Sequence, residues 1–248
     1  METKEQAQKL QDWIDESKNI VFFGGAGVST ESGIPDFRSQ DGLYNQEWDY
    51  PPEQILSAGF FLANPKEFYR FYRAKILIPG IKPNSAHKKL AEMEAAGKLK
   101  AVITQNIDGL HQAAGSKVVY ELHGSTLRNH CVKCGMSYDY DYVVDKKHAD
   151  RDGIARCSGC KDIIKPNVVL YGEGLDDDVV NKTLEALRDA DMVIIGGTSL
   201  SVYPAAGFIN AYRGDRIVLI NRDPTESDGI ASLVIHDSIG KVLSAVRV

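Results

Sequence analysis

Short runs of apolar residues alternate along the chain with longer segments in which apolar residues recur at helical spacing. The apolar runs predict strands that are buried on both faces. They cover residues 20–23, 101–104, 118–122, 167–171, 192–195, 216–220 and 233–235. Helical spacing predicts helices over 5–18, 176–189 and 204–212, and further helices that begin at Pro65, Ser85 and Ser238. This alternation predicts an α/β fold, a Rossmann-like doubly wound parallel sheet with helices on both faces.

Polar residues and glycines gather just after the carboxyl ends of the predicted strands. The segments concerned are 25–38, 105–108, 123, 197–199 and 221. In an open parallel sheet these strand ends share one edge, and ligands bind at that edge. The sequence therefore predicts one ligand site that is built from several distant segments.

The first strand ends in a glycine-rich loop, Gly24-Gly25-Ala26-Gly27. Missing side chains let backbone N–H groups approach a phosphate closely, and residues 28–30 predict a short helix whose N-terminus faces the same place. Glycine and proline then cut the helix off, and an acid, an aromatic ring and a cation follow at 36–38. The loop predicts a dinucleotide or phosphate site. Taken alone, residues 36–38 are better explained by a tight turn with a surface salt bridge.

A conventional NAD dehydrogenase is an alternative for this loop. Such enzymes carry the pattern G-x-G-x-x-G, and this chain has Thr30 in place of its third glycine. An acidic residue also normally follows about 20 residues further on, and none closes a second strand here. Both differences disfavour hydride transfer.

All four cysteines lie in two C-x-x-C pairs, Cys131 with Cys134 and Cys157 with Cys160. In a reducing compartment such pairs are metal ligands more often than disulfides, and four thiolates complete a tetrahedral Zn²⁺ site. Four protein ligands leave no position for water, so we expect the zinc to be structural. Replacement of one thiolate by His130 is a weaker alternative. A zinc ribbon that binds nucleic acid is another, but aspartates offset the lysines around the pairs.

Composition narrows the function classes further. The 248 residues can form one large domain or two modest ones, and 25% charged with 43% hydrophobic residues is typical of a soluble globular protein. A net charge of −5 disfavours direct binding of nucleic acid, which needs clustered Lys and Arg. No apolar run approaches the roughly 18 residues of a membrane span, and the N-terminus shows no signal sequence. We therefore expect a cytoplasmic protein without a membrane partner.

The sequence of residues 25–38, GAGVSTESGIPDFR, is similar to the signature of the sirtuins, the NAD-dependent protein deacylases. Three later blocks follow in the family's order: TQNID at 104–108, HG at 123–124 and GTSL at 197–200. The resemblance covers nearly the whole chain. One difference is Gly24, where many members have Thr, and it spares the residues expected to contact ligands.

The resemblance implies a protein-lysine deacetylase that consumes NAD, transfers the acetyl group from lysine to ADP-ribose and releases nicotinamide. The pyrophosphate is expected on the glycine loop and on residues 198–199, the adenosine near Asn221, and the nicotinamide near Asn106 and Asp108. His123, which follows a strand and precedes a glycine, suits a general base. The expected catalytic residues are thus His123 and Asn106. The expected NAD-binding residues are Gly25, Ala26, Gly27, Thr30, Asp36, Phe37, Arg38, Gln105, Asn106, Ile107, Asp108, His123, Gly197, Thr198, Ser199, Asn221, Asp237 and Ser238.

The resemblance also implies that an acetyl-lysine protein or peptide binds as an extra strand, paired through its main chain. The expected substrate-binding residues are Val169, Tyr171, Gly172, Glu173, Val202 and Tyr203. Sirtuins that favour acidic acyl groups carry a Tyr-x-x-Arg pair. Here Tyr69 is followed three residues later by Tyr72, and Arg73 is one position out of register. We therefore expect removal of acetyl or other uncharged acyl groups, with protein ADP-ribosylation at the same site as an alternative.

For the domain organisation we expect a Rossmann-like NAD-binding domain of residues 1–38, 87–123 and 167–248. A smaller inserted domain of residues 39–86 and 124–166 is expected to carry a helical module and the zinc ribbon. The sequence leaves the oligomeric state open.

Overall fold

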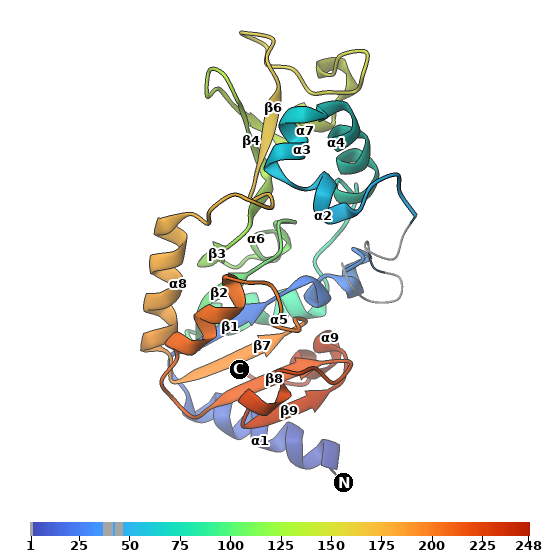
Figure 1. The fold of residues 1–248 in the computed structure, drawn as a ribbon. Helices are drawn as coiled ribbons and strands as arrows, with labels where there is room; N and C mark the ends of the chain where they lie inside the picture. The colour runs from blue at the N-terminus through green and yellow to red at the C-terminus, as the bar shows by residue number, and fades with distance from the viewer. Residues whose placement is uncertain (1, 37–41, 43–46) are drawn as a thin grey trace.

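The larger part of the protein is built around a six-stranded parallel sheet (Figure 1). The computed structural model describes residues 2–36, 42 and 47–248. The strands of this sheet are β1 (Ile20–Gly24), β2 (Leu99–Thr104), β3 (Val119–Glu121), β7 (Met192–Gly196), β8 (Ile217–Asn221) and β9 (Leu233–His236). They lie in the order β3-β2-β1-β7-β8-β9, and every neighbouring pair is parallel. The order reverses between β1 and β7, and open α/β sheets bind ligands at the carboxyl ends of strands where such a reversal occurs.

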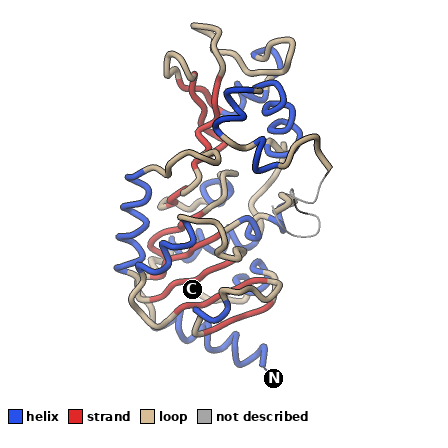
Figure 2. Tube along the Cα trace, in the orientation of Figure 1, coloured by secondary structure: helices blue, strands red, loops and turns tan. Residues whose placement is uncertain are grey.

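Side chains of β1 alternate between the two faces of the sheet and enter two separate cores. Ile20 and Phe22 enter the core that α1 (Glu2–Glu16), α5 (Ser85–Ala95) and α9 (Ile239–Ser244) cover. Val21 and Phe23 enter the core that α8 (Asp177–Asp189) and the 3-10 helix η6 (Ala205–Ala211) cover. Figure 2 shows these helices on both sides of the strands. The predicted doubly wound α/β fold is confirmed.

A second sheet, antiparallel and three-stranded, lies at the opposite end of the molecule from the chain termini (Figure 1). Its strands are β4 (Gly124–Cys131), β5 (Ser137–Asp139) and β6 (Ile164–Val168), in the order β5-β4-β6. The helices beside it are α2 (Pro52–Ile55), α3 (Ala58–Ala63), α4 (Pro65–Phe71), the π-helix η4 (Tyr72–Ile76), α7 (Tyr140–Val144) and the 3-10 turn η5 (Lys146–His148). Aromatic side chains of α4 and η4 form much of the third core, which this unit buries. Asn64 caps α4 as predicted, because its side chain accepts the N–H of Glu67.

The chain passes from the large sheet to the small one at His123 and Gly124. Gly124 has a φ of +74°, and a Cβ at this position would lie 1.9 Å from the backbone oxygen of Asn167 on β6. No residue larger than glycine fits such a close approach of two strands. On the return of the chain, the N–H of Val169 donates to the carbonyl of His123 at 2.9 Å. The two places where the chain passes between the sheets, one at His123 and Gly124 and the other at Val169, therefore lie side by side.

The structure differs from the predicted elements in several places. The strand predicted over 167–171 is wrong, because β6 ends at Val168 and pairs antiparallel with β4 in the small sheet. The helix predicted over 204–212 is the shorter 3-10 helix η6. After β1 the chain forms two 3-10 turns, η1 (Ala26–Val28) and η2 (Thr30–Ser32), and α6 (Leu110–Ala114) and η7 (Asp228–Ile230) were not predicted. None of the helices in the described part of the chain combines the length and apolar character that crossing a bilayer requires.

Candidate functional site

A cavity of about 890 Å³ lies at the carboxyl edge of the parallel sheet and extends to the small sheet and its helices. It brings together most of the residues that the sequence singles out. Those lining it are Ala26, Gly27, Thr30, Asp36, Gln105, Asn106, Ile107, Asp108, His123, Val169, Tyr171, Gly172, Glu173, Gly197, Thr198, Ser199, Val202, Tyr203, Asn221, Asp237 and Ser238. Gly25 is not among the lining residues, and Phe37 and Arg38 fall outside the described residues. A cavity of this size exceeds the needs of one small group and is within the range of known ligand pockets.

Glycines bring the loop after β1 into direct backbone contact with the loop after β7. The N–H of Gly25 donates to the carbonyl of Gly196 at 3.2 Å, and that of Gly27 donates to Gly197 at 2.8 Å. A Cβ on Gly27 would lie 2.8 Å from the Cα of Gly197, so a side chain would separate the loops. Sequence reasoning gave these two N–H groups to a phosphate. In the structure they join the loops, and the glycines shape the floor of the cavity.

Thr198 is held in place by Asn221 at the end of β8. The side chain of Asn221 accepts the N–H of Thr198 at 3.1 Å and donates to its carbonyl at 2.9 Å. The hydroxyl of Thr198 in turn accepts the N–H of Leu200 at 3.1 Å, and Leu200 has a φ of +54°. Asn221 therefore fixes the shape of the 197–200 loop, in addition to any contact with a ligand.

Ser29, Asn106 and Asp108 form a buried hydrogen-bonded group on the opposite wall. The hydroxyl of Ser29 donates to Asp108 Oδ2 at 2.7 Å and accepts from Asn106 Nδ2 at 3.0 Å, while the N–H of Leu110 donates to Asp108 Oδ1 at 2.8 Å. Burial raises the pKa of Asp108 above its usual value, and the charge of Glu121 adds to this, whereas the two hydrogen bonds oppose it. Ser29 was not among the predicted site residues. Its place in the GAGVS block was the available signal.

His123 lies at the junction of the two sheets with one ring nitrogen engaged. Its Nδ1 is 3.0 Å from the carbonyl oxygen of Gln105, which assigns the proton to Nδ1 and leaves the lone pair on Nε2. Burial lowers the pKa of His123 from 6.5, and the bond to Gln105 partly offsets this. The ring is therefore neutral at neutral pH, and Nε2 is free to accept a proton.

The two segments predicted to pair with a peptide are not strands in this structure. The backbone of Tyr171 already pairs with the start of α3: its N–H donates to Leu56, and its carbonyl accepts the N–H of Ala58. Tyr203 follows a bend after the 197–200 loop and is 76% exposed. Both segments line the cavity, and main-chain pairing with a peptide there stays a prediction.

The helix residues relevant to acyl selectivity separate into those that reach the cavity and those that do not. Tyr72 lines the cavity, and its apolar neighbours there include Phe68 and Ile76. Tyr69 instead donates its hydroxyl to the carbonyl of Ile164. Arg73 donates to the carbonyls of Gly153 and Val144, away from the cavity lining. No tyrosine–arginine pair of the described helices therefore faces the cavity together.

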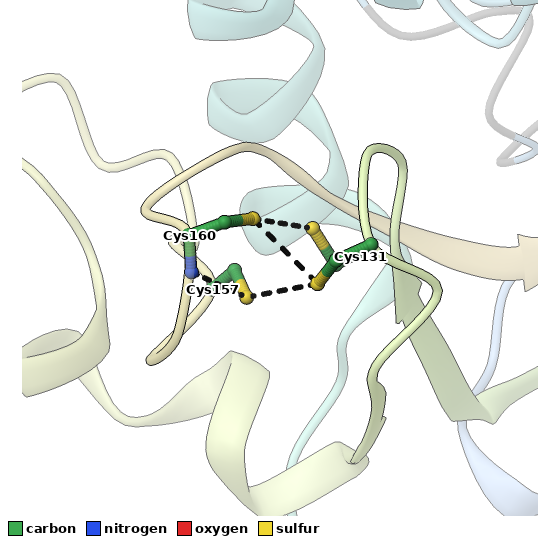
Figure 3. Close-up of side chains that lie close together, drawn as sticks. Cys131, Cys157 and Cys160 are labelled. Atoms are coloured by element: carbon green, nitrogen blue, oxygen red, sulfur yellow. Dashed lines mark hydrogen bonds between the residues drawn. The ribbon is translucent and has the colours of Figure 1, made fainter.

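The four cysteines converge in the small unit (Figure 3). The Sγ atom of Cys131 lies 3.3 Å from that of Cys160, and the Sγ atom of Cys134 lies 3.6 Å from those of Cys157 and Cys160. All four sulfur atoms are within 4.8 Å of one another. A tetrahedral zinc with Zn–S bonds of about 2.3 Å places its sulfurs about 3.8 Å apart, so the cluster fits zinc. With four thiolates as ligands the metal is structural.

Hydrogen bonds to sulfur differ among the four cysteines. The hydroxyl of Tyr138 donates to Cys157 Sγ at 3.0 Å and is the largest of several hydrogen bonds that lower the pKa of Cys157 to about 6, whereas the neighbouring sulfurs raise the pKa of Cys134 and that of Cys160. His130, the alternative ligand, instead contacts Asn167 Oδ1 through its Nδ1 at 2.5 Å. The four-cysteine prediction is therefore confirmed as a metal site.

Comparisons of this chain with known proteins all point to one family. The model of the Sir2 family matches residues 25–204 of this chain. An NAD-dependent protein deacetylase of Clostridium perfringens is 57% identical over 241 residues, which are 96% of this chain and 97% of that protein. One of Clostridium acetobutylicum is 54% identical over 240 residues, 96% of each chain.

Solved structures show the same relationship. A structure described as Sir2 with a p53 peptide and NAD⁺ has a TM-score of 0.83 and 38% identity, and the match covers 95% of both chains. A Sir2 structure with deacetylated p53 peptide and 3′-O-acetyl ADP-ribose has a TM-score of 0.88 and 37% identity over 96% of both chains.

Proposed function

This chain belongs to the Sir2 family, and we propose that its cavity brings NAD and an acetylated lysine together for deacetylation. The protein is an NAD-dependent protein-lysine deacetylase. It transfers the acetyl group to ADP-ribose and releases nicotinamide. The observation that carries the proposal for the site is the single cavity that joins the glycine loop, the Asn106–Asp108 wall and His123.

We assign the binding of NAD to residues around the end of β1, β7 and β8. Gly27 and Thr198 are proposed to lie against the pyrophosphate, and Asn221, Asp237 and Ser238 to lie around the adenosine. When bound, NAD supplies the ribosyl carbon that receives the acetyl oxygen, and its nicotinamide leaves. The remaining predicted NAD contacts, Phe37 and Arg38 included, stay proposals.

The opposite wall is proposed to hold the nicotinamide and to move one proton. Asn106 and Asp108 are already fixed by Ser29, so they can present their polar groups without rearrangement. His123 Nε2 would take the proton from a substrate hydroxyl while Nδ1 stays bonded to Gln105. A neutral, half-enclosed imidazole is suited to this general-base step.

The acyl group is proposed to be uncharged. Arg73 is held by carbonyl groups away from the cavity, and the cavity wall near the helices is largely made of side chains such as Phe68, Tyr72 and Ile76. This supports acetyl and other apolar acyl groups over succinyl. Lys75 also lines the cavity, and a faster reaction with succinyl-lysine than with acetyl-lysine would refute the proposal.

We also propose the predicted division into a domain of 1–38, 87–123 and 167–248 and an inserted domain of 39–86 and 124–166. The separate core of the small unit supports it. A zinc site of four thiolates needs reduced cysteines, which supports action in the cytoplasm.

The test is the release of nicotinamide from NAD with and without an acetyl-lysine peptide. We expect release that depends on the peptide and matches its deacetylation, with a loss of deacetylation of about 100-fold or more in His123→Ala. Release that is indifferent to the peptide, or ADP-ribose attached to the peptide, would refute deacetylation as the reaction of this site. Normal deacetylation by His123→Ala would refute only the role of that side chain.

A further inference from the structure

Lys165 is a largely enclosed lysine whose charge no step of the reaction uses. It lies on β6, and its side chain is 14% exposed. Its Nζ donates to Glu173 Oε2 at 3.0 Å, to the carbonyl of Val168 at 3.0 Å and to that of Pro166 at 3.3 Å. An ammonium group has three N–H donors, and here each has an acceptor. Such a complete set indicates a defined position and not a mobile surface chain.

The partner of Lys165 fixes the turn that follows β6. Glu173 Oε2 also accepts the N–H of Leu170 at 2.8 Å, and the N–H of Glu173 donates to the carbonyl of Leu170 at 2.9 Å. The carboxylate therefore joins the cation on β6 to the backbone of residues 170–173. This segment belongs to no strand, so tertiary contacts such as these must impose its backbone conformation.

The same segment lines the cavity beside His123. Val169 is bonded to His123, and Tyr171 is bonded to Leu56 and Ala58, which fix the first half of the segment. The second half, with Gly172 at a φ of +91°, has the Lys165–Glu173 pair as its described side-chain support. Glu173 was expected to contact a peptide. Its carboxylate also holds the turn, through Oε2.

We propose that Lys165 is a positioning residue for the protein substrate: through Glu173 it holds residues 170–173 in the conformation that receives the peptide backbone. The inference rests on the proposed function, since it requires a peptide in this part of the cavity. The pair joins an enclosed lysine to a partly exposed carboxylate, and such a pair is weak evidence for net stability. Its role in the proposal is to hold one geometry of the turn. The effect of losing it should therefore fall on peptide binding and not on NAD.

The experiment compares Lys165→Met, which keeps an apolar stem, with Lys165→Arg, which keeps the charge. Steady-state kinetics give KM for the peptide, KM for NAD and kcat, and fluorescence anisotropy gives Kd for a labelled acetyl-lysine peptide without NAD. We expect Lys165→Met to raise peptide KM and Kd about tenfold, equivalent to about 1.4 kcal/mol, with NAD KM and kcat within about twofold of the original. Lys165→Arg should restore most of the affinity.

The matched control is Lys182→Met, which breaks the exposed pair of Lys182 and Asp178 on α8. Both side chains of that pair are more than half exposed, so we expect no change in any constant. Unchanged peptide binding in Lys165→Met would overturn the proposal. Equal losses in peptide binding, NAD binding and thermal stability would also overturn it, because they indicate a general structural role.

If Lys165→Met does not fold, Lys165→Gln decides, because its amide keeps two N–H donors for the acceptors around Lys165 and removes the charge that pairs with Glu173. Weaker peptide binding with unchanged NAD KM then supports the proposal, and unchanged peptide binding overturns it. A wild-type protein that does not deacetylate the peptide would refute the proposed function itself. An active wild type with an indifferent Lys165→Met refutes only the role of Lys165.

Discussion

Acidification should destabilise this protein through two neighbouring histidines in the core, whose rings are tilted by 58° to each other. His87 on α5 and His111 on α6 are 0% and 1% exposed, and their ring centroids are 4.7 Å apart. His87 Nε2 and both ring nitrogens of His111 have no hydrogen-bond partner among the described residues. Burial lowers the pKa of His87 from 6.5 to about 4 and that of His111 to about 3, with His87 adding to the effect on His111.

The sign and size of the effect follow from these pKa values. Below pH 6.5 the unfolded chain binds protons at both rings while the folded chain does not, so the free energy of unfolding falls with pH. The interval from the unfolded pKa of 6.5 down to a pH of about 5 spans about 1.5 pH units. Over it, each histidine lowers the free energy of unfolding by about 1.36 kcal/mol per unit. The loss is about 2 kcal/mol for each histidine and about 4 kcal/mol for the pair. A typical total stability is about 5–15 kcal/mol, so the change is large enough to measure.

The variant that isolates this effect is His111→Phe, which keeps a ring of similar size and removes two unpartnered nitrogens. Urea unfolding at about pH 7 and about pH 5 should show that the variant loses about 2 kcal/mol less than the wild type on acidification. Comparing the two proteins cancels other groups, including Asp108, whose raised pKa acts in the opposite direction. Zinc content is measured at both pH values to show that the metal stays bound. An equal loss in His111→Phe and wild type would refute the reasoning.

Three further predictions concern the glycine-rich loop after β1, the passage of the chain between the two sheets, and the metal site. Glu31 Oε1 accepts the N–H of Gly240 at 2.9 Å and so connects the loop after β1 to α9. We expect Glu31→Ala to raise KM for NAD about fivefold and Glu31→Gln to leave it unchanged. Equal KM values in the two variants would contradict this. Gly124→Ala places a methyl group against the backbone of β6 and should lower the unfolding free energy by about 3 kcal/mol or more, as measured by thermal unfolding. In Gly229→Ala the new methyl group meets no atom within 4 Å, so this control should unfold like the original protein. Cys157→Ser should reduce the metal content from about one zinc per chain and lower the melting temperature, and full zinc content by elemental analysis would exclude the four-thiolate site.

The large sheet could be predicted because its strands need little beyond their own sequence. All residues of β1 and β7 are buried, so an unbroken apolar run was a sufficient signal for each. The loops at the carboxyl ends carry glycine, amide and acidic residues, and parallel pairing brings those ends together whatever the details of each loop. The approximate location of the site therefore followed from topology. A short helix was predicted over 28–30, but its division into the two 3-10 turns η1 and η2 could not be, since the bond from Gly27 to Gly197 in a distant loop helps to set the backbone there.

The segment proposed to receive the peptide shows where sequence patterning fails and why. Residues 167–171 form an apolar run like those of the large sheet, but a run records only that a strand is buried and not which sheet buries it. Val168 pairs with β4, while the backbone of Tyr171 finds its partners on the loop before α3, more than a hundred residues earlier in the chain. Likewise, the sequence presented Glu173 as a ligand residue because nothing local shows that Lys165 reaches it. The conformation of this segment is the sum of distant contacts, so a substitution at Lys165 can alter substrate binding without touching a substrate.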